Sequence, residues 1–521
     1  MESIKDIQLA AITNDKIYWN CSRPIQEECM YFLLIDRFHD GKERTTTTSQ
    51  VGYGSAEELQ RRCKGTLRGI IKQLEYISEM GMTSIWLNPF QQNNFESYHG
   101  YAIENFLEVD KEWGTKDDLI ELVTKAHALN MRVFFDVVLN HTGDNWSYIK
   151  NQPVYQKGKT YTTKSWRYSD KPIPSELRNF NCYNRKGRIK DWEAIPETWE
   201  GDIYELKDLI QDASSQGDSN LEVMVAIYSY WFALTDCDGF RIDAAKHIPP
   251  NWLNTFIEEI KRLALGVGKK NFFIFAEIIS NLSVVEKYKA IDGYLDFDFY
   301  FTSVDRLLHK NEKQIGIHQT SLDAIPIRFL DNHDQIGQKI KRRIASNTNK
   351  SQFLNLLKVF LMMPGVPCIY YGTEQGLKGK GKNDSAIREC MFDPFGSTDV
   401  FNKESVFYKT IKQFSKFREE WGMQLGIVES CIVEHLYKGD CIALQISNLT
   451  QSKLVLYNLN SENELVNVKL ARPMSRNNKL VVYLSADSKC LIADLKVEGD
   501  TITRIPIAPN DFIVLDIGML A

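Results

Sequence analysis

The sequence predicts an α/β barrel of eight parallel strands, followed by an antiparallel β domain. Eight short apolar runs mostly alternate with amphipathic helical runs between residues 29 and 421. The apolar runs are nearly continuous, which is typical of parallel strands that are covered on both faces. After about Gly426 the pattern changes to short alternating strands. These observations predict a TIM (β/α)8 barrel with a C-terminal antiparallel β-sandwich.

The barrel elements follow one another in the expected order. The strands are predicted at 29–38, 83–89, 132–141, 238–247, 271–279, 293–299, 325–334 and 368–376. The helices are predicted at 67–81, 116–130, 221–236, 252–265, 351–363 and 407–421 from their apolar spacing. A doubly wound open sheet would carry a glycine-rich phosphate-binding stretch after its first strand. No such stretch is present there, so the barrel is favoured.

The alternation stops after the third strand, where the chain becomes polar and rich in aromatic residues. A segment of this length without helical period is too long for a plain loop, so it predicts a small inserted domain. The predicted domains are a barrel part with a short N-terminal extension, an inserted domain, a second barrel part and a C-terminal β domain. Their bounds are 1–142, 143–216, 217–425 and 426–521.

Composition narrows the class of protein. The 521 residues have a formal net charge of −5, which gives no reason to expect nucleic acid or an anionic membrane surface as a partner. The ten cysteines are scattered without a CxxC pair, which predicts free core thiols in a reducing compartment. No secretory signal and no membrane-spanning stretch is visible, so a cytoplasmic protein is expected.

Polar residues gather where the predicted strands end, which is where active sites of such barrels lie. The fourth strand reads DGFRIDAAKH, and its side-chain period of two places Arg241 and Asp243 on one face. The other strand ends carry Asp136, Asn140 and His141, then Glu277, then Asp331 to Asp334, then Glu374. Burying several carboxylates around one axis is costly unless partners or function offset the cost.

Two of these carboxylates have contrasting sequence surroundings. Asp243 lies beside Arg241, whose charge is expected to lower the pKa of the carboxyl and keep it ionised. Glu277 lies within FFIFAEII, whose apolar side chains are expected to raise its pKa and retain a proton. The structural alternatives are a buried ion pair and a lone half-buried acid. The contrast predicts the nucleophile and acid of a retaining glycosidase.

The seventh strand end contains two acids, and N-capping of the next turn is the structural alternative for each. We assign capping to Asp334 and a site role to Asp331. His99, His141 and His333 are each open to a purely structural role, but three histidines near strand ends favour a site. Metal binding by these histidines stays an alternative, although HxH and HExxH spacings are absent.

Four stretches together resemble the signature regions of glycoside hydrolase family 13, the α-amylase family. They are DVVLNH (136–141), GFRIDAAKH (239–247), FAEI (275–278) and FLDNHD (329–334), in the order of that family. The resemblance runs from about Tyr31 to about Trp421 and includes the insertion. It implies a barrel enzyme that cleaves α-1,4-glucosidic bonds in starch, glycogen or maltooligosaccharides through a covalent glycosyl intermediate.

The resemblance also implies roles for individual residues. Asp243 is similar to the family's nucleophile, Glu277 to its general acid/base, and Asp331 to its third carboxylate. The implied substrate contacts are His99, Tyr101 as a stacking platform, His141, Arg241, Lys246, His247, His333, Asp384 and Arg388. The implied calcium ligands are Asn140, Asp208 in LKDL and the backbone carbonyl of His247. Lys207 stands where the family stretch has proline, which weighs against calcium.

Within the family, several activities share one catalytic set. The Lys246–His247 pair and Ala244 after the nucleophile favour an α-amylase. Glucanotransferases, cyclomaltodextrinases and trehalose-forming isomerases remain alternatives. The insertion and the loops determine whether water or a sugar accepts the glycosyl group. Two alternatives of another class are a catalytically silent subunit of the same fold and a starch-binding module. Both are disfavoured, because the chain retains Asp243, Glu277 and Asp331.

Overall fold

The structure is a computed structural model of the 521-residue chain. It describes residues 1–48, 52–55, 57–94, 97–167, 172–212, 219–301, 323–334, 343–379, 383–420, 432–435, 441–447, 451–458, 462, 464–470, 481–485, 495–498, 500–509 and 512–519.

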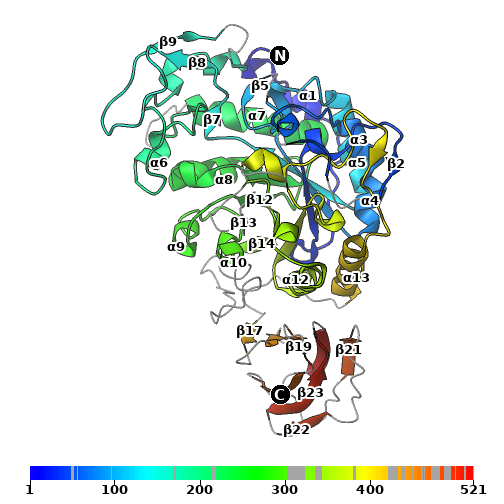
Figure 1. Ribbon diagram of the computed structural model, residues 1–521. Helices are drawn as coiled ribbons and strands as arrows, with labels where there is room; N and C mark the ends of the chain where they lie inside the picture. The colour runs from blue at the N-terminus through cyan, green and yellow to red at the C-terminus, as the bar shows by residue number, and fades with distance from the viewer. Residues whose placement is uncertain are drawn as a thin grey trace.

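Eight parallel strands close into a barrel at the centre of the molecule (Figure 1). They are β1 (Met30–Leu33), β3 (Ser84–Leu87), β6 (Arg132–Val137), β11 (Gly239–Ile242), β12 (Phe273–Ala276), β13 (Gly293–Leu295), β14 (Ile325–Phe329) and β15 (Val366–Tyr370). Each strand pairs with the next in chain order, and β15 returns to β1. All eight predicted strands and the predicted barrel are therefore confirmed.

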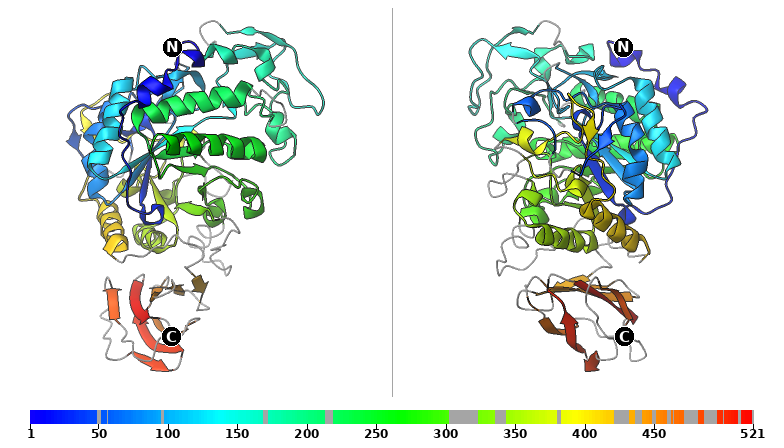
Figure 2. Two further views of the ribbon diagram at one scale, coloured as in Figure 1. Left: turned by 180° about the vertical axis from the view of Figure 1, so that it is seen from behind. Right: turned by 45° about the vertical axis from the view of Figure 1, so that its right-hand side comes forward.

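Helices cover the barrel from outside. They are α3 (Leu67–Lys72), α4 (Leu74–Glu79), α5 (Lys116–Ala128), α7 (Ser219–Thr235), α8 (Pro250–Gly266), α12 (Lys350–Met362) and α13 (Val406–Glu420). In α5, Thr115 and Asp118 form a capping box that satisfies the first free amides. Figure 2 shows α7 and α8 side by side against the strands, where α8 buries Trp252, Phe256 and Ile260.

Local structure differs from the sequence prediction in several places, most clearly in the first strand and the first helix. The predicted first strand ends at Leu33, and one helical turn, α2 (Ile35–Phe38), follows it. The helix predicted over 67–81 is interrupted at Gln73, which separates α3 from α4. Short elements in the connections add α1 (Leu9–Thr13), β2 (Thr45–Thr46), β4 (Gln91–Asn93), β5 (Ile103–Val109), α9 (Leu282–Val285), α10 (Phe297–Phe299) and β16 (Thr398–Asp399).

The segment after β6 leaves the barrel and forms small pairs of strands near the N-terminus (Figure 1). Its elements are β7 (His141–Thr142), β8 (Trp146–Tyr148), β9 (Thr163–Trp166), α6 (Glu197–Glu200) and β10 (Lys207–Asp208). Trp146 is fully buried and belongs to the same apolar core as the barrel. The domain limits 143–216 stay a prediction, although the inserted segment itself lies after the third barrel strand.

The C-terminal part is antiparallel, as predicted. One sheet contains β17 (Ile432–His435), β18 (Cys441–Ser447), β19 (Gln451–Asn458), β21 (Val481–Ser485) and β24 (Phe512–Met519). The other contains β20 (Glu464–Lys469), β22 (Lys496–Glu498) and β23 (Thr501–Ile507). Leu454 and Leu515 of the first sheet share an apolar cluster with Val466 and Ile502 of the second, so the two sheets enclose one core.

The prediction of free thiols is wrong for one pair of cysteines. Cys63 and Cys390 form a disulfide between residues 327 positions apart. The described free cysteines are all buried: Cys21, Cys29, Cys182, Cys237 and Cys368. Because disulfides persist in oxidising surroundings, the cytoplasmic location loses its support from cysteine usage and stays a prediction. Among the described helices, none combines the length and the apolar character that a membrane span requires.

Candidate active site

Arg241 on β11 holds three carboxylates at the carboxyl end of the barrel. Its Nη1 atom lies 2.7 Å from an oxygen of Asp136 and 2.8 Å from Oδ1 of Asp243, and its Nη2 atom lies 2.9 Å from Oε2 of Glu277. The strand register produces this meeting, because Arg241 stands opposite Asp136 on β6 and Phe275 on β12. The strand β11 fits between these neighbours because it begins with Gly239, where an added Cβ would lie 1.8 Å from the Phe273 carbonyl oxygen.

The carboxylates of this cluster share one compensating charge. Burial raises the pKa of Asp136 to about 6 and the pKa values of Asp243 and Glu277 to about 7, although Arg241 acts to lower all three. The opposed environments predicted for Asp243 and Glu277 are therefore not present. Three carboxylates around one guanidinium titrate together, so near neutral pH the cluster retains protons as a unit.

Glu277 has one oxygen fixed and one oxygen open. Its Oε2 accepts a hydrogen bond from the backbone N–H of Ala244 at 3.0 Å. Its Oε1 is buried and has no hydrogen-bond partner among the described residues. Ala244 follows Asp243 in a left-handed conformation, with φ of 47°, which turns the chain out of β11 directly after that carboxylate. The open oxygen of Glu277 is suited to carry a proton.

Tyr101 forms an aromatic wall beside the carboxylates. Its hydroxyl donates to Asp136 at 2.8 Å, which fixes the ring. The ring stacks on His333 with centroids 5.3 Å apart and on His99 with centroids 5.8 Å apart. The structure therefore brings the predicted platform residue and two predicted histidines together.

The histidines of the site are neutral at pH 7. Burial lowers the pKa of His99 to about 3 and that of His141 to about 4, and it lowers that of His333 well below its usual value. His141 Nε2 lies 3.1 Å from the Tyr101 carbonyl oxygen, while its Nδ1 has no partner among the described residues. These rings can exchange hydrogen bonds with hydroxyl groups without adding charge.

The two acids of FLDNHD face different surroundings. Asp331 accepts hydrogen bonds from the Ile344 amide at 2.7 Å and from the Thr373 hydroxyl at 3.3 Å. Asp334 instead lies 2.6 Å from Arg388 and 3.4 Å from His333. Its charge raises the pKa values of both Asp243 and Glu277, whereas Asp331 is engaged by the segment before α12. Asp334, for which the sequence predicted a helix cap, is thus the acid of this stretch whose charge acts on Asp243 and Glu277.

Arg388 connects Asp334 with the aromatic wall. It donates to the His333 carbonyl at 2.8 Å and to the Tyr98 hydroxyl at 3.2 Å, and it is buried. Asp384 is exposed, and its negative charge contributes to the raised pKa of Arg388. Glu374, which sequence position placed at a strand end, accepts hydrogen bonds from Tyr31 and Tyr76 inside the molecule.

Lys246 and His247 contact the inserted segment. The Lys246 Nζ atom lies 2.5 Å from Glu193, whose side chain is 73% exposed. His247 Nδ1 lies 3.0 Å from the Thr198 carbonyl oxygen, and its ring meets the edge of Trp192 at 5.5 Å. Burial lowers the pKa of His247 to about 4. The insertion therefore borders the site beyond β11.

Two predicted calcium ligands lie on neighbouring short strands. Asp208 on β10 stands opposite His141 on β7, directly after Asn140. The side-chain oxygens Asn140 Oδ1 and Asp208 Oδ1 are buried without hydrogen-bond partners among the described residues. Lys207 does not face them, because its Nζ atom pairs with Asp144 at 2.8 Å. These oxygens fit a hard cation, although the described residues hold no cluster of three histidine, cysteine or acidic side chains.

The closed barrel and the acid cluster at its carboxyl end define an enzyme scaffold with a buried acid–base site. Residues 32–412 match the α-amylase catalytic domain family. The chain belongs to this family of glycoside hydrolases and transglycosylases, as its signature stretches predict.

Relatives within the family have more than one activity. The chain is 27% identical to an α-amylase of Saccharomycopsis fibuligera over 75% of its own length and 74% of that protein. It is 30% identical to an α-amylase of Streptomyces lividans over 63% of its length, but this spans only 42% of that protein. A cyclomaltodextrin glucanotransferase of Bacillus sp. (strain 17-1) is 27% identical over 70% of this chain and 52% of the relative.

Solved structures share the fold. The α-amylase of Geobacillus thermoleovorans complexed with acarbose superposes with a TM-score of 0.72 at 24% identity, over 95% of this chain and 99% of that one. A γ-cyclodextrin glucanotransferase from alkalophilic Bacillus clarkii gives a TM-score of 0.70 at 23% identity, over 94% of this chain and 70% of the other. Similarity of this degree shows the architecture alone.

Proposed function

We propose that the protein is a retaining glycoside hydrolase of the α-amylase type, which cleaves α-1,4-glucosidic bonds in starch, glycogen or maltooligosaccharides. The observation that carries this proposal is the Arg241 cluster, in which one guanidinium contacts both Asp243 and Glu277. A shared holder keeps the two carboxyl groups close, as the retaining mechanism requires. Relatives that bind acarbose or maltotriose agree with an α-glucan substrate.

The chemistry proceeds in two displacements. Asp243 attacks the anomeric carbon and forms the glycosyl–enzyme ester, while Glu277 transfers its proton to the departing glycosidic oxygen. Glu277 then removes a proton from water, which attacks the anomeric carbon and releases Asp243. Of the protons that the cluster retains, one on Glu277 serves the first step, and Arg241 stabilises the ionised form of Asp243.

We assign the third carboxylate to Asp334 in place of Asp331. Asp334 is held by Arg388 and acts electrostatically on both reacting carboxyl groups. A carboxylate beside the anomeric carbon stabilises the positive charge that develops there in the transition state. The remaining implied contacts keep their roles as substrate-binding residues: Tyr101, His99, His141, Arg241, Lys246, His247, His333, Asp384 and Arg388.

Transglycosylation is the second candidate, because cyclomaltodextrin glucanotransferases are among the relatives. Both reactions share the glycosyl–enzyme ester and differ only in whether water or a sugar hydroxyl resolves it. Lys246 and His247 contact the insertion, and we propose that an acceptor sugar enters beside this segment. We favour water as the acceptor on the basis of that pair and its resemblance to amylases.

We also propose that a Ca²⁺ ion is held by Asn140, Asp208 and the backbone carbonyl of His247. Bound there, it would supply a fixed charge that joins the insertion to the barrel, apart from the reacting carboxylates.

A time course with maltoheptaose tests the activity. We expect shorter maltooligosaccharides to accumulate from the first minutes, without products longer than the substrate. Asp243→Asn should lower kcat by at least about 10³-fold while binding persists, because it removes the attacking oxygen. Longer or cyclic products from the start would favour the transferase, and unchanged turnover of the variant would exclude Asp243 as nucleophile.

A further inference from the structure

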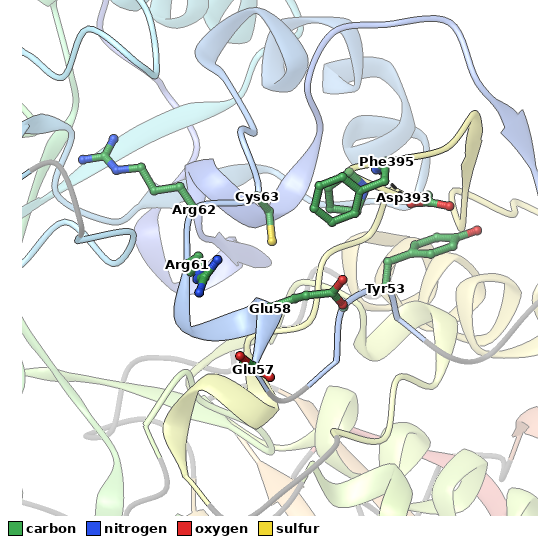
Figure 3. Close-up of a pocket in the computed structure, with 10 residues that line it drawn as sticks. Tyr53, Glu57, Glu58, Arg61, Arg62, Cys63, Asp393 and Phe395 are labelled. Atoms are coloured by element: carbon green, nitrogen blue, oxygen red, sulfur yellow. Dashed lines mark hydrogen bonds between the residues drawn. The ribbon is translucent and has the colours of Figure 1, made fainter.

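A cavity outside the acid cluster lies between the segment that follows β1 and the segment that follows β15. Its volume is about 380 Å³, and Figure 3 shows the side chains around it. The residues that matter here are Tyr53, Glu57, Glu58, Arg61, Asp393 and Phe395. A volume in this range suits a small ligand or one segment of a longer one.

One wall of the cavity is apolar and fixed. Tyr53 packs against a small cluster of Leu59, Cys63, Cys390 and Phe392, and its hydroxyl donates to Thr398 at 2.8 Å. The disulfide between Cys63 and Cys390 ties the two wall segments together. The parallel pair β2–β16 ties them a second time. This wall is therefore preformed.

Phe395 presents an aromatic ring to solvent at the mouth of the cavity. The residue is 85% exposed, although hydrogen bonds hold the loop that carries it. Its amide donates to Asp393 Oδ1 at 3.0 Å, and Arg44 donates to the Asp393 carbonyl oxygen. An exposed ring on a fixed loop offers a flat apolar surface for stacking.

The rim of the cavity carries hydrogen-bonding groups of both signs. Among the described residues, no ion pair or hydrogen bond engages the side chains of Glu57 and Arg61. Glu58 and Asp393 add further carboxylates. The acids disfavour an anion, and the Arg61 guanidinium disfavours a simple cation. A neutral ligand with many hydroxyl groups and an apolar face satisfies both the rim and the aromatic wall.

The cavity is linked to the acid cluster through buried arginines. Arg37 donates to the backbone carbonyls of Leu59 and Arg61 at 2.8 and 2.9 Å and lies over the ring of Tyr98 at 3.9 Å. The Tyr98 hydroxyl in turn accepts from Arg388, which pairs with Asp334. Arg37, Tyr98 and Arg388 thus connect the cavity wall in turn with Asp334.

We propose that this cavity is a second α-glucan-binding site, which stacks a glucosyl residue on Phe395 and Tyr53 and takes no part in bond cleavage. The ligand class rests on the proposed function, whereas the geometry of the cavity does not. By holding a long glucan at a second point, the site raises the effective concentration of the chain at the acid cluster. Short substrates gain nothing from it.

Adsorption to insoluble starch granules tests the site directly. The protein used is the full chain carrying Asp243→Asn, so that the starch is not consumed. Adding Phe395→Ala should raise the apparent Kd for starch about two- to tenfold, as expected for one lost aromatic contact. Arg61→Ala should act in the same direction. The matched control is Leu265→Ala on α8, a 64% exposed apolar residue far along the chain from the cavity, which should leave adsorption unchanged.

A kinetic comparison on the active protein completes the test. Phe395→Ala should raise KM for amylose by the same factor and leave kcat/KM for a p-nitrophenyl maltotrioside unchanged. Adsorption that is unaffected by both Phe395→Ala and Arg61→Ala overturns the proposal, as does an equal loss with Leu265→Ala. A third outcome is that the wild type adsorbs to starch in a way that depends on Phe395 and yet cleaves no α-glucan. That result would contradict the proposed function and would still support the second binding site.

Discussion

Arg241 is the residue on which the acid cluster depends, because its guanidinium is the positive charge that contacts Asp136, Asp243 and Glu277 together. The sequence pattern FRID predicts that Arg241 and Asp243 share a face, since strand side chains alternate. It does not predict that Asp136 joins them, because that contact depends on the register between β6 and β11. Burial raises the pKa of Asp243, and Arg241, which is shared by three carboxylates, offsets only part of that rise.

Asp334 and Asp331 have different contacts, although they lie three positions apart, and we propose different roles for them. Strand periodicity could not choose between them, because β14 ends at Phe329 and both acids lie on irregular backbone. Our assignment rests on the ion pair between Asp334 and Arg388, which is far away in the sequence.

Substitution of each acid separates the two roles. We expect Asp334→Asn to lower kcat by about 10²–10³-fold, because it removes charge stabilisation of the transition state. Asp331→Asn should retain most of kcat, because the amide oxygen can still accept from Ile344. Steady-state kinetics on maltoheptaose measures both effects, with thermal unfolding as the control for folding. A larger loss of kcat in Asp331→Asn would reverse the assignment.

The raised pKa of Glu277 makes stability depend on pH. Between about pH 4 and pH 7 the folded protein holds a proton that the unfolded chain has released, so this contribution to stability falls as pH rises. Glu277→Gln removes the ionisable group. We expect the variant to be more stable than the wild type by about 1–3 kcal/mol at pH 7.5 and by less at pH 5. Denaturant unfolding at both pH values measures this, and a pH-independent difference would contradict it.

At the scale of elements, the barrel strands could be predicted because each is a short apolar run bounded by turn residues. The break at Gln73 could not, because the apolar spacing continues through it. The pairing of β7 with β10 could not be predicted from sequence patterns either, because each strand has only two residues. The resemblance of LKDL to the family stretch nevertheless indicated Asp208 as a candidate ligand.

The β7–β10 pair gives a test of calcium. We expect Ca²⁺ at a hundredfold excess over its Kd to stabilise the wild type by about 2.7 kcal/mol relative to EDTA-treated protein. Asp208→Asn should weaken this response, because it removes the anionic ligand. Thermal unfolding with and without EDTA is the measurement, and Asp144→Asn, which alters the partner of Lys207, is the matched control. If EDTA leaves the melting temperature of the wild type unchanged, the calcium site is excluded.

At the scale of the whole molecule, the disulfide joins segments that follow the first and last barrel strands. Cysteine spacing could not reveal this pair, because 327 positions separate the two residues. The closure of β15 on β1 brings them together. The barrel and the C-terminal sheets were predictable, since alternation patterns are local.

Removing the disulfide tests its contribution to stability. The double variant Cys63→Ala/Cys390→Ala should lose about 2–5 kcal/mol of unfolding free energy, because the cross-link restricts the unfolded chain. Reductant should lower the denaturant midpoint of the wild type and leave that of the double variant unchanged. A wild-type midpoint that is independent of reductant would show that the cross-link adds nothing.

The central claim is that Asp243 and Glu277 act as the nucleophile and the acid of a retaining reaction. The most direct measurement is proton NMR of the anomeric signals during the first minutes of maltoheptaose cleavage, before mutarotation. Two displacements at one carbon predict that the α-anomer is released first. Initial release of the β-anomer would contradict the account, because it would require a single displacement by water.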